Sequence, residues 1–153
     1  MPGSDSGARR PLIRLVPAPD EPPPTVVQRY FEELWRLGDL PVADEIFAAD
    51  VVLRALGGSL HGIGAVKECV AMFRAAFPDL DVLHQPERVT GETIVELFTM
   101  HGTHHGEFQG IAATGRPVVF KGVATFRVGG SRIEDVSIAF DLGDLLRQLG
   151  AGP

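Results

Sequence analysis

Three of the chain's five histidines stand within five positions, at His101, His104 and His105. A histidine has an ordinary pKa of about 6.5, so one of these side chains could accept or donate a proton at neutral pH. A metal site is an alternative, with Glu107 as a further ligand, but zinc needs three or four ligands that converge. A third interpretation is structural: a buried histidine can tie the end of a strand to the following loop.

The alternation of a β-strand would place the three histidines on two faces. Consecutive side chains of a strand point to opposite sides, so the even-numbered residues from 94 to 104 share one face. That face is mainly apolar and includes His104, whereas His101 and His105 point the other way. His104 is therefore the candidate acid or base. Its neighbours are expected at the surface or at an interface, and no metal site is expected.

Two carboxylates near the end of the chain are further candidates for acid or base chemistry. Glu134 has the parity of an inward-facing strand residue, but it could equally be a solvated charge at a strand edge. Asp141 could stand close to the mouth of a pocket. It also precedes a helical pattern, with Asp144 three residues later, as an N-cap residue does. The N-cap is the favoured interpretation of Asp141, and both carboxylates remain candidate catalytic residues.

The elements that would position these residues fall into two blocks. Apolar residues at helical spacing predict helices over residues 25–40 and 63–77 and a short helix over residues 41–50, with Thr25 as an N-cap. A strand and a glycine-rich turn are predicted between residues 51 and 62. After Pro78 apolar residues recur at every second position. This alternation predicts strands over residues 80–90, 92–104, 117–128 and 132–140. This order predicts an α+β fold: a curved antiparallel sheet wrapped around three N-terminal helices as a cone-shaped barrel.

Length and composition limit the organisation and the partners of the chain. Its 153 residues allow one domain, at residues 25–150, and the Pro- and Gly-rich residues 1–24 are expected to form a flexible tail. The net charge of −6 argues against nucleic acid or an anionic membrane as a partner, since both need a basic surface. Cys69 is the only cysteine, which excludes an intrachain disulfide and fits a reducing compartment, so the expected location is the cytoplasm.

The segment GTHHGEFQGIAATGRPVVFKGVATFRV resembles the signature of the SnoaL-like polyketide cyclases, a branch of the nuclear-transport-factor-like cone fold. Two other segments, AFPDL at residues 76–80 and FDLGDLLRQLG at residues 140–150, also match in type and order. The resemblance extends over residues 25–150 and implies a pocket between the helices and the sheet. The matching signature positions are Gly102, Thr103, His104, Gly106, Phe108, Gly110, Thr114, Gly115 and Arg116.

The resemblance implies an enzyme without a cofactor that promotes ring closure or isomerisation of a hydrophobic polyketide intermediate in an apolar pocket. The best-known members place an acid on the last strand and a histidine on the preceding strand, but these positions are Ile138 and Ala124 here. Neither residue can carry a proton, so His104 would be the main acid or base. A cyclase that mainly orients its substrate would need few polar groups. The residues implied to shape the cavity are Trp35, Met100, Ala124, Phe126, Ile138 and Phe140.

Two alternatives stay open. An epoxide-opening or hydroxylation-assisting enzyme on the same fold would need a pocket carboxylate, for which Glu134 and Asp141 are the candidates. A non-catalytic binding or accessory protein would keep the pocket and lack the acid. A small, hydrophobic, polyketide-like molecule is the expected partner for the enzyme, and the resemblance also implies a homodimer formed through the outer face of the sheet. Tyr30 is expected in the core, and His84 is expected to face solvent.

Overall fold

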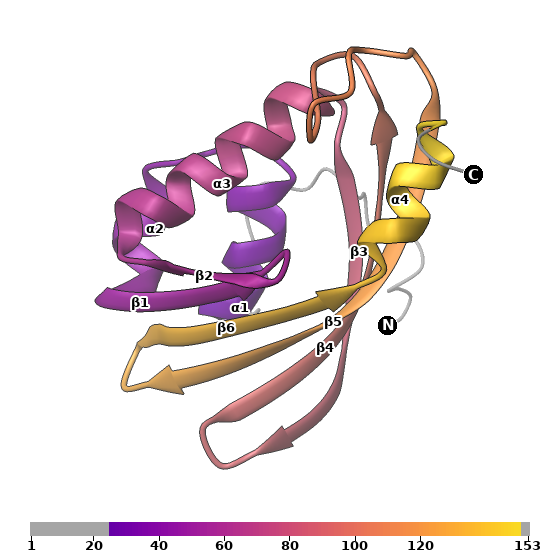
Figure 1. Cartoon of the computed structure of the whole chain (residues 1–153). Helices are drawn as coiled ribbons and strands as arrows, with labels where there is room; N and C mark the ends of the chain where they lie inside the picture. Colours follow the sequence, from indigo (N-terminus) through magenta and orange to yellow (C-terminus); the bar gives the residue numbers. More distant parts are fainter. Residues whose placement is uncertain (1–24, 151–153) are drawn as a thin grey trace, which may run out of the picture.

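The computed structural model describes residues 25–150, so the tail predicted for residues 1–24 lies outside the described part of the chain. A short helix α1 (Val26–Arg29) continues directly into a π-helix, η3 (Tyr30–Trp35), and α2 (Val42–Ile46) follows. The long helix α3 (Ile63–Ala76) and the C-terminal helix α4 (Leu142–Gln148) complete the helical part. Figure 1 shows that α1, α2 and α3 gather on one side of the sheet, whereas α4 lies near its other end. The predicted α+β class is confirmed.

The sheet has six strands in the order β2-β1-β6-β5-β4-β3. The strands β3 to β6 form an antiparallel meander, and their bounds lie within a residue or two of those predicted. The pairing of β1 with β6 is parallel, so the sheet is mixed rather than antiparallel. A parallel pair cannot be joined by a tight hairpin, and here the long connection between the two strands runs through β2, α3 and the meander. The strands are β1 (Phe47–Ala55), β2 (Gly58–His61), β3 (Asp81–Thr90), β4 (Thr93–Thr103), β5 (Pro117–Gly129) and β6 (Arg132–Phe140).

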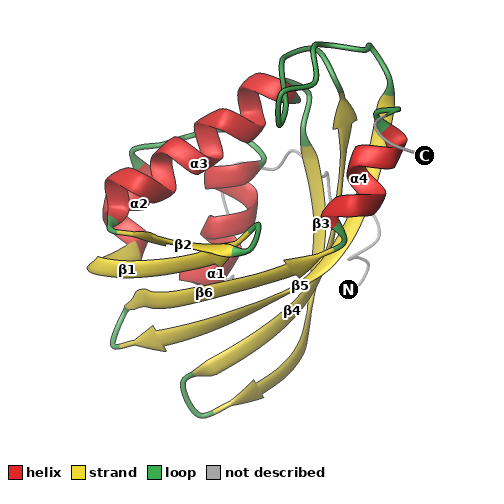
Figure 2. Ribbon diagram, viewed as in Figure 1, coloured by secondary structure: helices red, strands yellow, loops and turns green. Residues whose placement is uncertain are grey.

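The curved sheet does not close on itself, so the barrel expected from the sequence is wrong. The outermost strands, β2 and β3, occupy opposite ends of the strand order and do not pair with each other. Figure 2 shows the sheet as a curved, open layer with α1, α2 and α3 packed into its concave side. The helices and the inner face of the sheet therefore enclose the core between them.

The N-terminal helices begin as predicted and end earlier. The Thr25 hydroxyl accepts a hydrogen bond from the backbone N–H of Gln28 at 3.1 Å, and the Gln28 amide oxygen accepts one from the Thr25 N–H at 2.8 Å. The helix predicted over residues 41–50 ends at Ile46, because Phe47 adopts an extended backbone and opens β1. Phe47 is fully buried and pairs with Ile133 of β6. This long-range pairing overrides the local helical pattern.

Side-chain parity along the meander agrees with the prediction. The even-numbered residues Phe98 and Met100 of β4, and Phe120 and Phe126 of β5, are all buried against the helices. The odd-numbered Val119 and Val123 of β5 are exposed on the outer face. One face of the meander therefore supplies the core, as the alternation predicts.

Candidate functional site

An apolar pocket lies between η3, α3 and the inner face of the sheet. Its cavity volume is about 30 Å³, and the space between its walls reaches about 420 Å³ when the part open to solvent is included. Its partly exposed members, Ala55, Ile138 and Phe140, mark the open end, whereas Tyr30 and Trp35 are buried. No acid, histidine or other charged residue of the described range 25–150 lines it. The lining residues are Tyr30, Phe31, Trp35, Ala55, Cys69, Phe73, Phe98, Met100, Phe120, Ala124, Ile138 and Phe140.

Most of the residues expected to shape a cavity line this pocket. Trp35, Met100, Ala124, Ile138 and Phe140 are all among its lining residues. Phe126 is not: it is fully buried, and its ring contacts Tyr30 and Phe31, with ring centroids 4.9 and 5.7 Å apart. Phe126 therefore supports two of the pocket's aromatic residues instead of lining the pocket.

Three polar atoms lie within the apolar lining. Burial raises the pKa of the Tyr30 phenol strongly, so this group stays protonated. A polar contact with the Trp35 side chain partly opposes this rise of the pKa, but the Tyr30 hydroxyl and the Trp35 Nε1 do not reach hydrogen-bond geometry with each other or with any other described residue. Burial also raises the pKa of the Cys69 thiol, to about 11, so it too stays protonated at neutral pH. The pocket thus offers donors and no base.

His104 points inward, as its parity predicts, but it is not among the lining residues of the pocket. Its side chain is fully buried, and its Nδ1 accepts a hydrogen bond from the backbone N–H of Thr114 at 3.2 Å and lies 3.0 Å from the Thr114 hydroxyl. An Nδ1 that accepts a hydrogen bond leaves the ring proton on Nε2, which has no partner among the described residues. The ring therefore links the end of β4 to the loop that leads into β5.

The loop after His104 rests on the C-terminal end of α3. The backbone N–H groups of His105 and Gly106 both donate to the carbonyl oxygen of Ala76, at 2.9 and 3.1 Å. A Cβ atom on Gly106 would lie 2.3 Å from the carbonyl oxygen of Ala75, a distance that real side chains do not reach. Glycine is required at this position by close backbone packing. The glycine at this position of the motif thus has a structural basis in this chain.

The other two histidines of the cluster face outward. His101 and His105 are exposed, and the His101 Nε2 lies 3.8 Å from a carboxylate oxygen of Asp81. Beside them, Asp79 accepts hydrogen bonds from the Thr103 backbone N–H and hydroxyl, each at 2.7 Å, and these bonds lower the pKa of the Asp79 carboxyl. In residues 25–150 no group of three or more His, Cys, Asp or Glu side chains could hold a metal ion.

The two carboxylates expected as acids lie outside the pocket lining. Glu134 forms an ion pair with Arg127 on the neighbouring strand. Asp141 caps α4, since its carboxylate accepts a hydrogen bond from the backbone N–H of Asp144 at 2.9 Å. Asp141 therefore has the geometry of an N-cap residue, which was the favoured interpretation of its position in the sequence. The structure does not bring His104, Glu134 and Asp141 together in one site.

A buried ionisable pair on the inner face of the sheet was not predicted from the sequence. Glu96 is only 4% exposed, and its carboxylate lies 2.7 Å from the Nδ1 of His84. The His84 Nε2 lies 3.0 Å from the carboxylate of Glu32 on η3, and the His84 ring stacks on Phe31 with centroids 4.4 Å apart. The expectation that His84 faces solvent is wrong, because pairing with Glu96 and stacking on Phe31 hold it under the helix. The sequence did contain a signal for this pair: Glu96 has an even number, and the even-numbered residues of β4 face the core.

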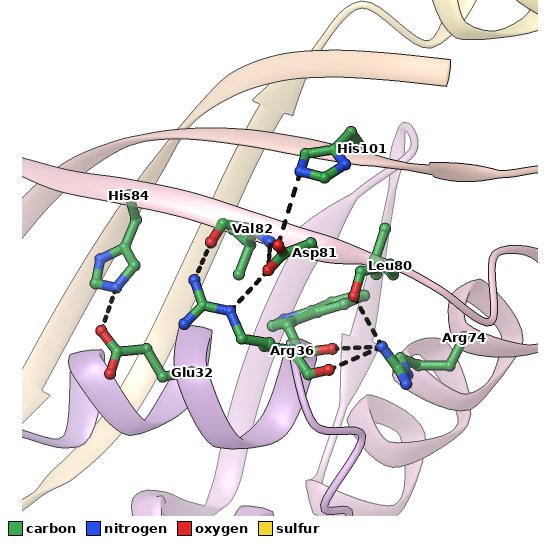
Figure 3. Close-up of polar contacts among 9 residues, drawn as sticks. Glu32, Arg36, Arg74, Leu80, Asp81, Val82, His84 and His101 are labelled. Carbon is green, nitrogen blue, oxygen red and sulfur yellow. Dashed lines mark hydrogen bonds and ion pairs between the residues drawn. The ribbon is translucent and has the colours of Figure 1, made fainter. Parts of the chain in front are cut away.

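Figure 3 shows that the contact of His84 with Glu32 belongs to a polar seam between η3 and β3. Arg36 donates to the Asp81 carboxylate at 2.8 Å and also to the carbonyl oxygen of Val82. Arg74 of α3 donates to the carbonyl oxygens of Trp35, Arg36 and Leu80. These bonds hold the C-terminal end of η3, and with it Trp35, in a defined position over the sheet.

The model of the SnoaL-like polyketide cyclase family matches residues 25–149. No curated protein matches the sequence. None of the helices in residues 25–150 is long and apolar enough to cross a membrane.

Solved structures with a similar fold come from several bacteria. A candidate SnoaL-like polyketide cyclase from Jannaschia sp. CCS1 is 23% identical with a TM-score of 0.77, and the match covers 84% of this chain and 91% of that one. IdmH, a candidate polyketide cyclase from Streptomyces antibioticus, is 27% identical with a TM-score of 0.70, over 82% and 96% of the two chains. AclR, a candidate hydroxylase from Streptomyces galilaeus, is 22% identical with a TM-score of 0.69, over 78% and 90%. The family model matches most of the chain's length, so the chain belongs to the SnoaL-like polyketide cyclase family.

Proposed function

We propose that this protein is a cyclase-like enzyme without a cofactor, which promotes ring closure or isomerisation of a hydrophobic polyketide intermediate. The observation that carries the proposal is the apolar, largely aromatic pocket at the place where the helices meet the concave face of the sheet. Aromatic walls pack against flat, conjugated molecules. Family membership supports polyketides as the substrate class.

The proposed mode of action is orientation of the substrate. The positions that hold the acid and the histidine in the best-known cyclases are Ile138 and Ala124, and both line the pocket as apolar residues. A reactive chain held in a folded conformation needs little further assistance, because holding the reacting groups together removes much of the entropic barrier. The catalytic roles expected for His104, Asp141 and Glu134 stay predictions. In this proposal His104 acts as a positioning residue for the loop that follows β4.

Fluorescence of Trp35 provides the direct test, because it is the only tryptophan and lies in the pocket wall. Titration with anthraquinone-like compounds and linear polyketide mimics is expected to quench this fluorescence saturably, with micromolar dissociation constants. The variant Ala55→Phe, which fills the open end of the pocket, is expected to weaken binding at least about tenfold, since a ligand of this kind depends on burial of its surface.

Ala49→Phe is the matched control for this experiment. Ala49 lies on the same strand as Ala55, is exposed, and does not line the pocket. Its substitution should leave the dissociation constants unchanged. Absence of quenching by every compound, in a folded protein, would contradict the proposed ligand class. Binding without turnover of any bound compound would instead support the non-catalytic binding protein.

A second candidate function is epoxide opening or assistance to a hydroxylation, and the buried Glu96–His84 pair favours it. No carboxylate lines the pocket, but this pair contacts Phe31, which does. A carboxylate paired with an imidazole can transfer a proton to or from a substrate. For this function, Glu96→Gln is expected to abolish turnover of a bound polycyclic epoxide and to leave its dissociation constant within about twofold. Unchanged turnover in this variant would exclude the second candidate.

We also propose that the protein forms a homodimer through the outer face of the sheet. We propose the cytoplasm as its location. Leu83, Val119 and Val123 expose 60%, 48% and 37% of their surface on this face. The lone cysteine is compatible with a reducing compartment. Exposed apolar residues on one face of a sheet are typical of an association surface between identical copies.

A further inference from the structure

Two hydrogen-bond donors in the wall of the pocket have no hydrogen-bond partner among the described residues. The Tyr30 hydroxyl and the Trp35 Nε1 are both buried, and neither forms a hydrogen bond with any residue in the described range 25–150. Buried polar groups in native proteins nearly always have a partner. Two such groups on one short helix, both lining the same cavity, indicate that the partner comes from a ligand.

The π-helical geometry of η3 explains why these two side chains reach the same pocket. Residues five apart in an α-helix, at about 3.6 residues per turn, point roughly 140° away from each other. In η3 the turn is wider, since the N–H of Arg36 donates to the carbonyl oxygen of Phe31, five residues earlier, at 3.0 Å. Tyr30 and Trp35 therefore approach one face, with ring centroids 6.3 Å apart. Such local π-turns often occur at functional sites.

The chemistry of the two groups limits what they can bind. The indole N–H can only donate, and the phenol stays protonated because burial raises its pKa. Their surroundings are apolar, with Cys69 as the one other polar lining side chain. The best partner is consequently an oxygen that accepts two hydrogen bonds and needs no proton of its own, as a ketone, quinone or enolate oxygen does.

We propose that Tyr30 and Trp35 form a two-donor site that binds one carbonyl oxygen of the substrate and orients it within the pocket. This proposal rests on the proposed function, in that it takes the pocket as the ligand site. If the substrate ketone enolises there, the same two donors stabilise the negative charge that develops on its oxygen. The proton released from the substrate carbon goes to solvent or to a group on the substrate, since no base lines the pocket.

A pair of ligands that differ only in the carbonyl group tests the two-donor site. 1-Tetralone and tetralin share a bicyclic skeleton, and only the first has a carbonyl oxygen. Calorimetric titration of the whole protein is expected to show tighter binding of 1-tetralone. Tyr30→Phe should weaken binding of 1-tetralone about tenfold, as expected for one lost hydrogen bond, and leave that of tetralin unchanged.

Two further measurements separate this role from a structural one. The single tryptophan provides one indole N–H signal in a ¹H–¹⁵N spectrum, and 1-tetralone is expected to shift its proton downfield more than tetralin does. The unfolding temperature of Tyr30→Phe should be unchanged or higher than that of the natural protein, because the substitution removes a buried hydroxyl without a partner. A structural hydroxyl would have the opposite effect and lower that temperature.

The possible outcomes distinguish the two proposals. Equal loss of affinity for both ligands in Tyr30→Phe, or no loss for either, would overturn the two-donor site and leave the pocket as a ligand site. Failure of both ligands to bind the natural protein would contradict the two-donor site together with the proposed function. Selective loss of 1-tetralone binding in a variant of undiminished stability would support both.

Discussion

Replacement of His84 by alanine is expected to lower the free energy of unfolding by about 3 kcal/mol, because it removes the hydrogen-bond partner of a buried carboxylate. The Glu96 carboxylate is 4% exposed, and His84 is its only hydrogen-bond partner among the described residues. Alanine would leave this carboxylate buried without a partner. It would also remove the ring that stacks on Phe31. Denaturant unfolding followed by circular dichroism measures the effect.

Two controls separate the buried contact from the exposed one. Glu32→Gln removes only the charge at the outer end of the seam, where the Glu32 side chain is 49% exposed, and should change stability by less than about 1 kcal/mol. The double variant His84→Leu/Glu96→Leu removes both members of the buried pair and should recover at least half of the loss. A loss in His84→Ala no larger than that in Glu32→Gln would show that Glu96 is not buried as described.

Gly106→Ala is expected to destabilise the protein by about 3 kcal/mol and to lower its unfolding temperature by roughly 6–12 °C. The added Cβ would meet the Ala75 carbonyl oxygen at 2.3 Å, so the loop must move away from α3. This movement would break the two hydrogen bonds that His105 and Gly106 donate to Ala76. Thermal unfolding measures the total effect, and faster hydrogen exchange at these two amides would locate it in the loop.

Gly64→Ala is the matched control for that substitution. Gly64 lies in the first turn of α3, and a Cβ atom there would meet nothing within 4 Å. Alanine should stabilise this helix by about 0.5–1 kcal/mol, because it restricts the unfolded chain more than glycine does. A decrease of stability in Gly64→Ala as large as that in Gly106→Ala would refute the steric explanation.

Strand bounds, side-chain faces and the caps at Thr25 and Asp141 were all predictable from local patterns. The alternation along β4 and β5 separates buried from exposed residues, because successive side chains of a strand point to opposite faces. The caps depend on one side chain and a backbone group three residues away. Each of these features requires only information that lies within a few residues.

The features that define the site depend on contacts between distant residues. Local periodicity continues a helix past Ile46, and only the pairing of Phe47 with Ile133 ends it. The contact of His104 with Thr114 spans ten residues, that of His84 with Glu96 twelve, and that of His84 with Glu32 fifty-two. Which polar groups meet, and which stay without a partner, follows from how the helices pack on the sheet. Residue type alone predicts core positions for Tyr30 and Trp35; only the wide turn of η3 and its position over the sheet bring both side chains into the wall of one pocket.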